Sequence, residues 1–270
     1  VQTCALPILT EKELTPSEPV TVVVSEMGWV RAAKGHEVDV QGLSYKAGDS
    51  YLASAQGRSN QQAVFMTNAG RTYSLEAHTL PSARGQGEPL TGKLSFTAGE
   101  QARYVLLGNE DETYLICSDA GYGFLCEYND LVSKNKNGKA LLTLPEGAQV
   151  LQPQLATQQD DALCLVISNE GRMLLFPLNT LPKLGKGKGN KLIGIPADKV
   201  ASREEFVTHV AVVHATQAVT LYAGKRKLTL KPTDMVLYHG ERGRRGAKLP
   251  RGLQRVDRIE LEPLATNSDV

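Results

Sequence analysis

Lysines and glycines alternate in one short stretch of the chain, residues 181–196, which reads LPKLGKGKGNKLIGIP. Lysine binds phosphate and glycine lets a backbone approach a ligand closely, so the pattern suggests a nucleotide-binding loop. Both common forms of that loop require glycine at position 190, where the chain has Asn190. The residues that follow, LIGIP, predict a short strand instead of the helix whose N-terminus would hold the phosphate. The stretch therefore does not predict a nucleotide site.

A second basic stretch, GERGRRGAKLPRG at 240–252, is denser in arginine. Residues 1–180 carry 13 basic and 20 acidic residues (net −7), whereas residues 181–258 carry 17 basic and 6 acidic residues (net +11). Concentrated positive charge favours an anionic polymer as partner. Lysines on glycine-rich loops suit sequence-independent contacts with DNA phosphates, and a merely solvated basic loop is the alternative interpretation.

Other residue types that could do chemistry form no catalytic or metal-binding pattern. His209 and His214 are five residues apart, which on a strand places them on opposite faces, so they cannot bind one ion together. Cys117, Cys126 and Cys164 lie in apolar runs without a CxxC pair, which predicts buried thiols in a reduced compartment. We therefore predict no catalytic residue, no metal and no cofactor in this chain.

The elements that must position the basic stretches come from a repeat. Four segments share a template of three apolar residues, Ser or Thr, two further residues and Gly: VVVSEMG (22–28), VFMTNAG (64–70), LICSDAG (115–121) and LVISNEG (165–171). Each precedes a second apolar run, which predicts a β-hairpin whose turn glycine adopts a positive φ. A fifth copy at 219–230 has a turn one residue shorter, and the turn glycines are Gly28, Gly70, Gly121, Gly171 and Gly224.

The spacing of these glycines, 42, 51, 50 and 53 residues, is typical of propeller-like arrays with several strands in each unit. Leu80, Leu131 and Leu181 each follow a turn glycine by ten residues and open similar connections, LPSARGQG, LVSKNKNG and LPKLGKGKG. The fifth copy has the longer LYHGERGRRG at 237–246. The basic loops are thus predicted to be one module, repeated at a fixed place in each blade.

The domain boundaries follow from the repeat. We expect an all-β domain over residues 20–263 with about five blades of four strands, and one short helix within 197–206. Residues 1–19 match no repeat and are interpreted as linker or non-domain sequence, and residues 264–270 as a disordered tail.

The turn glycines and basic loops resemble those of the C-terminal domain of the A subunit of bacterial type IIA topoisomerases, the gyrase and topoisomerase IV family. The segments that carry the resemblance span about residues 19–263 and are EPVTVVVSEMGWVRAAKGH, LPSARGQGEPLTGKL, SDAGYGF, NDLVSKNKNGKALLTLPE, GRMLLFP, LGKGKGNKLIGIP, GERGRRG and RGLQRVDRIE. The resemblance is greatest to topoisomerase IV. It implies a β-pinwheel, a propeller-like disc in which neighbouring blades exchange strands.

The resemblance also implies a function and partners. The domain would bind and bend double-stranded DNA and present the transported duplex for decatenation and relaxation of supercoils. Its partners would be the N-terminal breakage-reunion region of the A subunit, the B subunit in an A2B2 holoenzyme, and condensin, in the cytoplasm of a bacterium and associated with the nucleoid. The resemblance implies that the parent enzyme would be an ATP-dependent isomerase whose tyrosine, magnesium and ATP sites would lie outside this chain.

One departure from the family pattern concerns the first blade. The gyrase domain carries a box of the form QRRGGKG there, where this chain has DVQGLSYKAGD (39–49) with a single lysine. Tight wrapping and gyrase-type negative supercoiling are therefore not expected. The residues expected to contact DNA phosphates are Lys183, Lys186, Lys188, Lys191, Arg242, Arg244, Arg245, Lys248 and Arg251, extended on earlier blades by Arg31, Lys34, Arg71, Arg84 and Lys93.

Two further classes of function remain open on the residues alone. A propeller-like protein-interaction scaffold would use the same basic loops to bind an acidic partner. A propeller enzyme acting on sugars or phosphates would require acidic side chains that converge in a cavity. Trp29, beside the first turn glycine, is interpreted as a packing residue.

Overall fold

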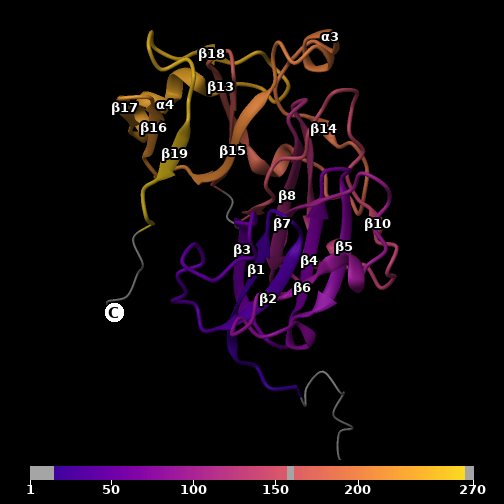
Figure 1. Ribbon diagram of the computed structural model, residues 1–270. Coiled ribbons are helices and arrows are strands. Elements are labelled where there is room, and N and C mark those ends of the chain that lie inside the picture. Colours follow the sequence, from indigo (N-terminus) through magenta and orange to yellow (C-terminus); the bar gives the residue numbers. More distant parts are fainter. Residues whose placement is uncertain (1–14, 157–160, 265–270) are drawn as a thin grey trace, which may run out of the picture. The chain divides into compact units, whose positions relative to one another are not determined.

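The computed structural model describes residues 15–156 and 161–264 (Figure 1). The expectations for residues 1–14 and 265–270 lie outside this part of the chain. Strands dominate the described residues and form five antiparallel sheets, which confirms the predicted all-β class. The described residues divide into two compact units: residues 15–67, 71–110 and 132–139 form one, and residues 68–70, 111–131, 140–156 and 161–264 form the other.

The first unit holds the first two hairpins. In the first sheet the strand order is β3 (Tyr51–Arg58), β1 (Pro19–Ser25), β2 (Trp29–Lys34) and β6 (Glu88–Pro89). In the second it is β10 (Lys139–Ala140), β5 (Arg71–Glu76), β4 (Gln62–Thr67) and β7 (Ala102–Leu107). Short 3-10 helices lie at η1 (Ala77–Thr79) and η2 (Leu90–Gly92).

The second unit holds three more hairpins. The third sheet has the order β11 (Gln154–Ala156), β8 (Thr113–Ser118), β9 (Tyr122–Glu127) and β14 (Asn190–Lys191). The fourth has β15 (Val207–His214), β12 (Ala162–Ser168), β13 (Arg172–Pro177) and β18 (Ala247–Lys248), and the fifth has β17 (Arg226–Leu230), β16 (Val219–Ala223) and β19 (Arg258–Leu261). The short helices of this unit are α2 (Tyr128–Leu131), η3 (Leu178–Thr180), α3 (Ala197–Ala201), α4 (Pro232–Met235) and η4 (Val236–Tyr238).

The five predicted hairpins are all present, and each turn glycine has a positive φ, between 57° and 82°. Such values are easy for glycine and costly for other residues. The helix expected within 197–206 is α3, which ends at Ala201. Apolar side chains of adjacent sheets belong to shared buried clusters within each unit: Val22 and Phe65 lie in one, Cys164 and Leu192 in a second, and Leu165 and Leu221 in a third. Burial of these rows stabilises each pair of blades.

A Gly-x-x-Leu motif carries the exchange of strands between blades. Each connection ends in a glycine with positive φ, followed three residues later by a leucine that is at most 2% exposed. The amide of that leucine donates a hydrogen bond to the carbonyl of a turn glycine, which belongs to the hairpin before the one that the connection follows. The four pairs are Gly87 and Leu90, Gly138 and Leu141, Gly189 and Leu192, and Gly246 and Leu249.

The direction of this exchange explains one difference from the expected four strands per blade. Each connection follows one hairpin and donates its short strand to the sheet of the hairpin before that one, so β6, after the second hairpin, joins the first sheet, and β18, after the fifth, joins the fourth. Five hairpins in this arrangement supply four exchanged strands. The fifth sheet accordingly has three strands among the described residues, and β17 lacks an exchanged neighbour there.

Candidate nucleic-acid interface

The basic connections recur at one place in the blade. In three copies the connection forms an isolated parallel bridge to the same hairpin strand that pairs with its exchanged strand. These bridges join Ala32 of β2 to Ser82, Leu125 of β9 to Lys183, and Leu175 of β13 to His239. The Gly-x-x-Leu motif then fixes the other end of the connection. The basic residues between these two anchors therefore lie on loops held at both ends.

The connection before β14 carries the most available lysines. Lys183 and Lys186 are exposed, and within the described part of the chain their side chains have no hydrogen-bond or ion-pair partner. The Nζ atoms of Lys188 and Lys191 lie 4.5 and 5.9 Å from the centroid of the Tyr122 ring. All four ammonium groups can therefore reach an external anion without breaking an ion pair.

The arginine-rich connection before β18 is largely occupied by internal contacts. Nη1 of Arg245 donates to the carbonyl of Gly194 at 2.5 Å, and its Nη2 lies 3.0 and 2.9 Å from the two carboxylate oxygens of Glu205, which is buried. Nη1 of Arg242 donates to the carbonyl of Lys191 at 2.9 Å. Both guanidinium groups therefore brace the segment from β14 to β15, at residues 191–205.

The other cations of this connection have weaker bonds. Arg244 forms an exposed ion pair with Glu241 at 2.9 Å. Nζ of Lys248 donates to the carbonyl of Glu170 at 2.7 Å and lies 3.9 Å from its carboxylate. Exposed pairs of this kind contribute little free energy and are screened by salt, so a phosphate can compete for Arg244 and Lys248. Arg251 is exposed.

The five expected residues of the first unit divide in the same way. Arg31 is 2% exposed, and its Nη1 donates to the carbonyl of Gly85 at 2.7 Å, so its side chain cannot reach a partner outside the fold. Arg31 is therefore removed from the residues expected to contact DNA phosphates. Arg71 donates to the carbonyl of Asn137 and lies 3.7 Å from buried Glu100. The other three keep more freedom: Lys34 and Arg84 are exposed, and Lys93 contacts Thr79 and Glu88.

Several cations outside the expected set occupy equivalent places. Lys134 and Lys136 are exposed on the connection before β10, and their place in the repeated loop was a signal available in the sequence. Lys46 lies over Trp29, with Nζ 3.6 Å from the ring centroid. No sequence signal places Lys46 there, because the two residues come from different segments of the first blade.

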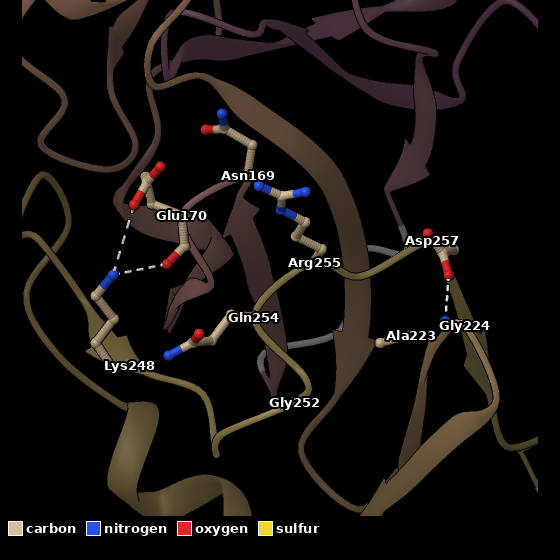
Figure 2. Close-up of a pocket in the computed structure, with 9 residues that line it drawn as sticks. All are labelled: Asn169, Glu170, Ala223, Gly224, Lys248, Gly252, Gln254, Arg255 and Asp257. Atoms are coloured by element: carbon tan, nitrogen blue, oxygen red, sulfur yellow. Dashed lines mark hydrogen bonds and ion pairs between the residues drawn. The ribbon is translucent and has the colours of Figure 1, made fainter.

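A polar hollow of about 530 Å³ lies beside the turns of the fourth and fifth hairpins (Figure 2). The guanidinium of Arg255 extends into it with no partner among the described residues, whereas Lys248 is tied to Glu170. The other acid, Asp257, accepts the amide of Gly224 at 2.6 Å. Both acids of the hollow are thus engaged, and the pair of free converging carboxylates expected of a propeller enzyme is not found in it.

The described residues contain no group of three or more His, Cys, Asp or Glu placed to bind a metal ion. Cys117, Cys126 and Cys164 are buried, as their apolar runs predicted, and form no disulfide within the described part of the chain. Burial raises the pKa of Cys117 and of Cys164. Within the described ranges, no helix is both long and apolar enough to cross a membrane.

Comparisons with a family model and with curated relatives point to the same protein family. The family model described as DNA gyrase C-terminal domain, beta-propeller, matches residues 61–100, 112–155 and 163–214. The chain is 57% identical over 254 residues to the A subunit of DNA topoisomerase 4 from Pseudomonas aeruginosa, and 51% identical over 254 residues to that of Escherichia coli. These matches cover 94% of this chain and 34% of each relative, so the chain spans about a third of their length.

Solved structures agree with the sequence relatives. The structure of the E. coli ParC C-terminal domain superposes with a TM-score of 0.84 at 50% identity, covering 91% of this chain and 99% of that one. A DNA gyrase A C-terminal domain shares the fold, with a TM-score of 0.64 at 14% identity over 91% of this chain and 83% of that one. The chain therefore belongs to the DNA gyrase C-terminal domain family and, within it, is similar to the C-terminal domain of the topoisomerase IV A subunit.

Proposed function

We propose that this domain binds duplex DNA along its basic connections, bends it, and presents it as the transported segment for decatenation and relaxation by topoisomerase IV. The observation that carries the proposal is the recurrence of basic loops, anchored at both ends, at one place in successive blades. Lysines on such loops match a backbone whose phosphates are spaced regularly. The contacts are independent of sequence, because no recognition helix is present among the described residues.

The catalytic steps belong to other parts of the enzyme in this proposal. The N-terminal breakage-reunion region of the A subunit, and the B subunit with its ATP and magnesium, would form an A2B2 holoenzyme around the domain. Condensin is a further proposed partner, and the nucleoid in the bacterial cytoplasm the proposed location.

The central test is the dependence of duplex binding on salt. Affinity should fall steeply with salt, and replacing Lys183 and Lys186 together by alanine should reduce the log–log slope by about 2, since each phosphate contact contributes about 0.9. Lys199→Ala is the matched control, because this lysine is ion-paired with Glu204 on a different connection. A parent slope near zero, or equal slopes in the double variant and the parent, would contradict the proposed phosphate contacts along the basic connections.

Bending is measured separately, by energy transfer between the ends of a labelled duplex of about 20–30 bp. Bending such a site by 40–90° requires about 1–6 kcal/mol, which several phosphate contacts together can offset. We expect the ends to approach each other on binding. Tight binding without approach would remove bending from the proposal, and absence of binding would favour the protein-interaction scaffold.

A further inference from the structure

Two blades carry an aromatic residue at the same position, directly after the turn glycine. Trp29 follows Gly28 at the start of β2, and Tyr122 follows Gly121 at the start of β9. Each is the first residue of a strand that pairs with an exchanged strand: Trp29 is opposite Pro89 in β6, and Tyr122 is opposite Lys191 in β14. Both rings therefore lie beside the anchored end of a connection.

The segment that carries Lys46 is held in place from both sides. The guanidinium carbon of buried Arg31 lies 4.7 Å from the centroid of the Tyr45 ring. The carbonyl of Tyr45 accepts a hydrogen bond from Nε2 of Gln86 at 3.3 Å. On the other side, Oδ1 of Asp49 accepts the amide of Met27 at 2.9 Å. These contacts place the Lys46 ammonium 3.6 Å from the centroid of Trp29.

The Tyr122 site repeats this arrangement with two lysines. Lys188 and Lys191 flank Gly189, whose positive φ and close packing on the carbonyl of Gly123 fix the backbone between them. The carbonyl of Lys191 also accepts a hydrogen bond from Nη1 of Arg242. Both ammonium groups then lie within 6 Å of the Tyr122 ring centroid, the range over which a cation is attracted to an aromatic face.

A lysine that is held over a ring has lost part of its rotamer freedom before it binds anything. At an exposed site the attraction of the ring is weak, so the ammonium can turn to a phosphate, which carries a full negative charge. We propose that Trp29 with Lys46, and Tyr122 with Lys188 and Lys191, are two phosphate-binding sites in which the ring positions the lysine for the DNA backbone. The proposal rests on the DNA-binding function above.

The salt dependence of duplex binding separates the roles of ring and lysine. Lys46→Met should reduce the log–log slope by about 0.9, because one phosphate contact is lost. Trp29→Leu should weaken binding about two- to fivefold and leave the slope unchanged, because the lysine is still present. A Lys46→Met slope equal to that of the parent would refute the first site.

The second site has a sharper control in its own ring. Tyr122→Leu should weaken binding about two- to fivefold, and Tyr122→Phe should restore most of that affinity, because a phenyl ring keeps the aromatic face without the hydroxyl. Equal losses in the leucine and phenylalanine variants would overturn the positioning role of the ring. Circular dichroism and thermal unfolding of each variant show whether it folds.

A readout other than affinity comes from Trp29, the single tryptophan of the chain. Its emission should change when duplex DNA is added, as Lys46 leaves the ring, and the change should be absent in Lys46→Met. Parent protein that binds DNA with no change in emission refutes this inference alone. Parent protein that shows no binding in the same titration refutes the DNA-binding function itself.

Discussion

Arginine and lysine have different roles at the level of single residues. Several arginines of the connections and of the strands beside them donate to backbone carbonyls, as Arg31 does to Gly85 and Arg172 to Gly246. The lysines of the connections instead stay exposed. The planar guanidinium can direct several N–H groups at fixed acceptors, whereas the ammonium is strongly hydrated and moves freely. A count of basic residues therefore overstates the charge available to DNA.

The ion pair between Arg245 and Glu205 gives a test of this structural role. Glu205→Ala should lower the free energy of unfolding by about 1–3 kcal/mol, because it leaves a partly exposed guanidinium without its buried partner. Glu241→Ala, which removes the exposed partner of Arg244, is the matched control and should change stability by less than about 0.5 kcal/mol. Urea denaturation measures both. Equal effects would show that the buried pair contributes no more than the exposed one.

Glu100 makes stability depend on pH. Burial alone would raise the pKa of Glu100, but hydrogen bonds from Thr97, Tyr73 and Thr67 outweigh it and leave the pKa below its ordinary value of 4.5. Protonation is then harder in the folded state than in the unfolded state. The stabilisation is complete above pH about 5 and is lost as the pH falls through the lowered pKa.

We therefore expect the free energy of unfolding to fall less between neutral pH and pH about 3.5 in Glu100→Gln than in the parent. Denaturation midpoints at both values measure the difference. The exposed Glu37→Gln substitution is the control and should leave the pH dependence close to that of the parent. A Glu100→Gln curve parallel to the parent curve would contradict the assigned role.

At the scale of elements, the Gly-x-x-Leu motif decides which sheets share strands. The glycine takes a left-handed conformation where a Cβ would meet a neighbouring carbonyl, and the leucine three residues later is buried. Strand exchange thus depends on these two residues in each connection.

Gly189 is the sharpest test of this motif, because its φ is +80° and a Cβ would lie 2.2 Å from the carbonyl oxygen of Gly123. Gly189→Ala should destabilise the domain by at least about 2 kcal/mol, from the unfavourable φ and the contact together. Gly85→Ala is the control, since Gly85 has no positive φ and open space at its Cβ. Thermal unfolding compares the two. A Gly189→Ala variant as stable as Gly85→Ala would show that the exchange tolerates a side chain.

At the scale of the whole molecule, charge is distributed unevenly along the chain. The net charge is −7 over residues 1–180 and +11 over residues 181–258. The second part includes the connections before β14 and β18, and phosphate contacts should be denser there than on the first two blades.

Uneven contact predicts limited wrapping of DNA. Nicked plasmid ligated in the presence of the domain should differ in linking number from plasmid ligated alone, because bent DNA follows a curved path. The change should be smaller than with a gyrase domain that carries the complete box. An equal change in linking number would show that the box is unnecessary for wrapping. No change in linking number would contradict the expectation that DNA wraps around the domain with one hand.

The sequence predicted the hairpins well, because a turn with Gly28 or Gly171 between apolar runs leaves few other conformations. It also predicted the recurring place of the connections. It failed at Arg31, whose burial depends on a carbonyl 54 residues away in the chain. It missed Lys46 for the same reason, since nothing near that lysine in the sequence indicates Trp29.

Local order was thus determined by the sequence alone: five hairpins, their turn glycines and the repeated loops follow from steric and hydrophobic rules that act within a few residues. The tertiary structure alone decided which connection joins which sheet and which cations remain free. Those choices depend on contacts such as Arg245 with Glu205 and Lys188 with Tyr122, between side chains 40 and 66 residues apart. Only packing brings such residues together, and packing therefore selects which positive charges remain available to an external anion such as the proposed DNA.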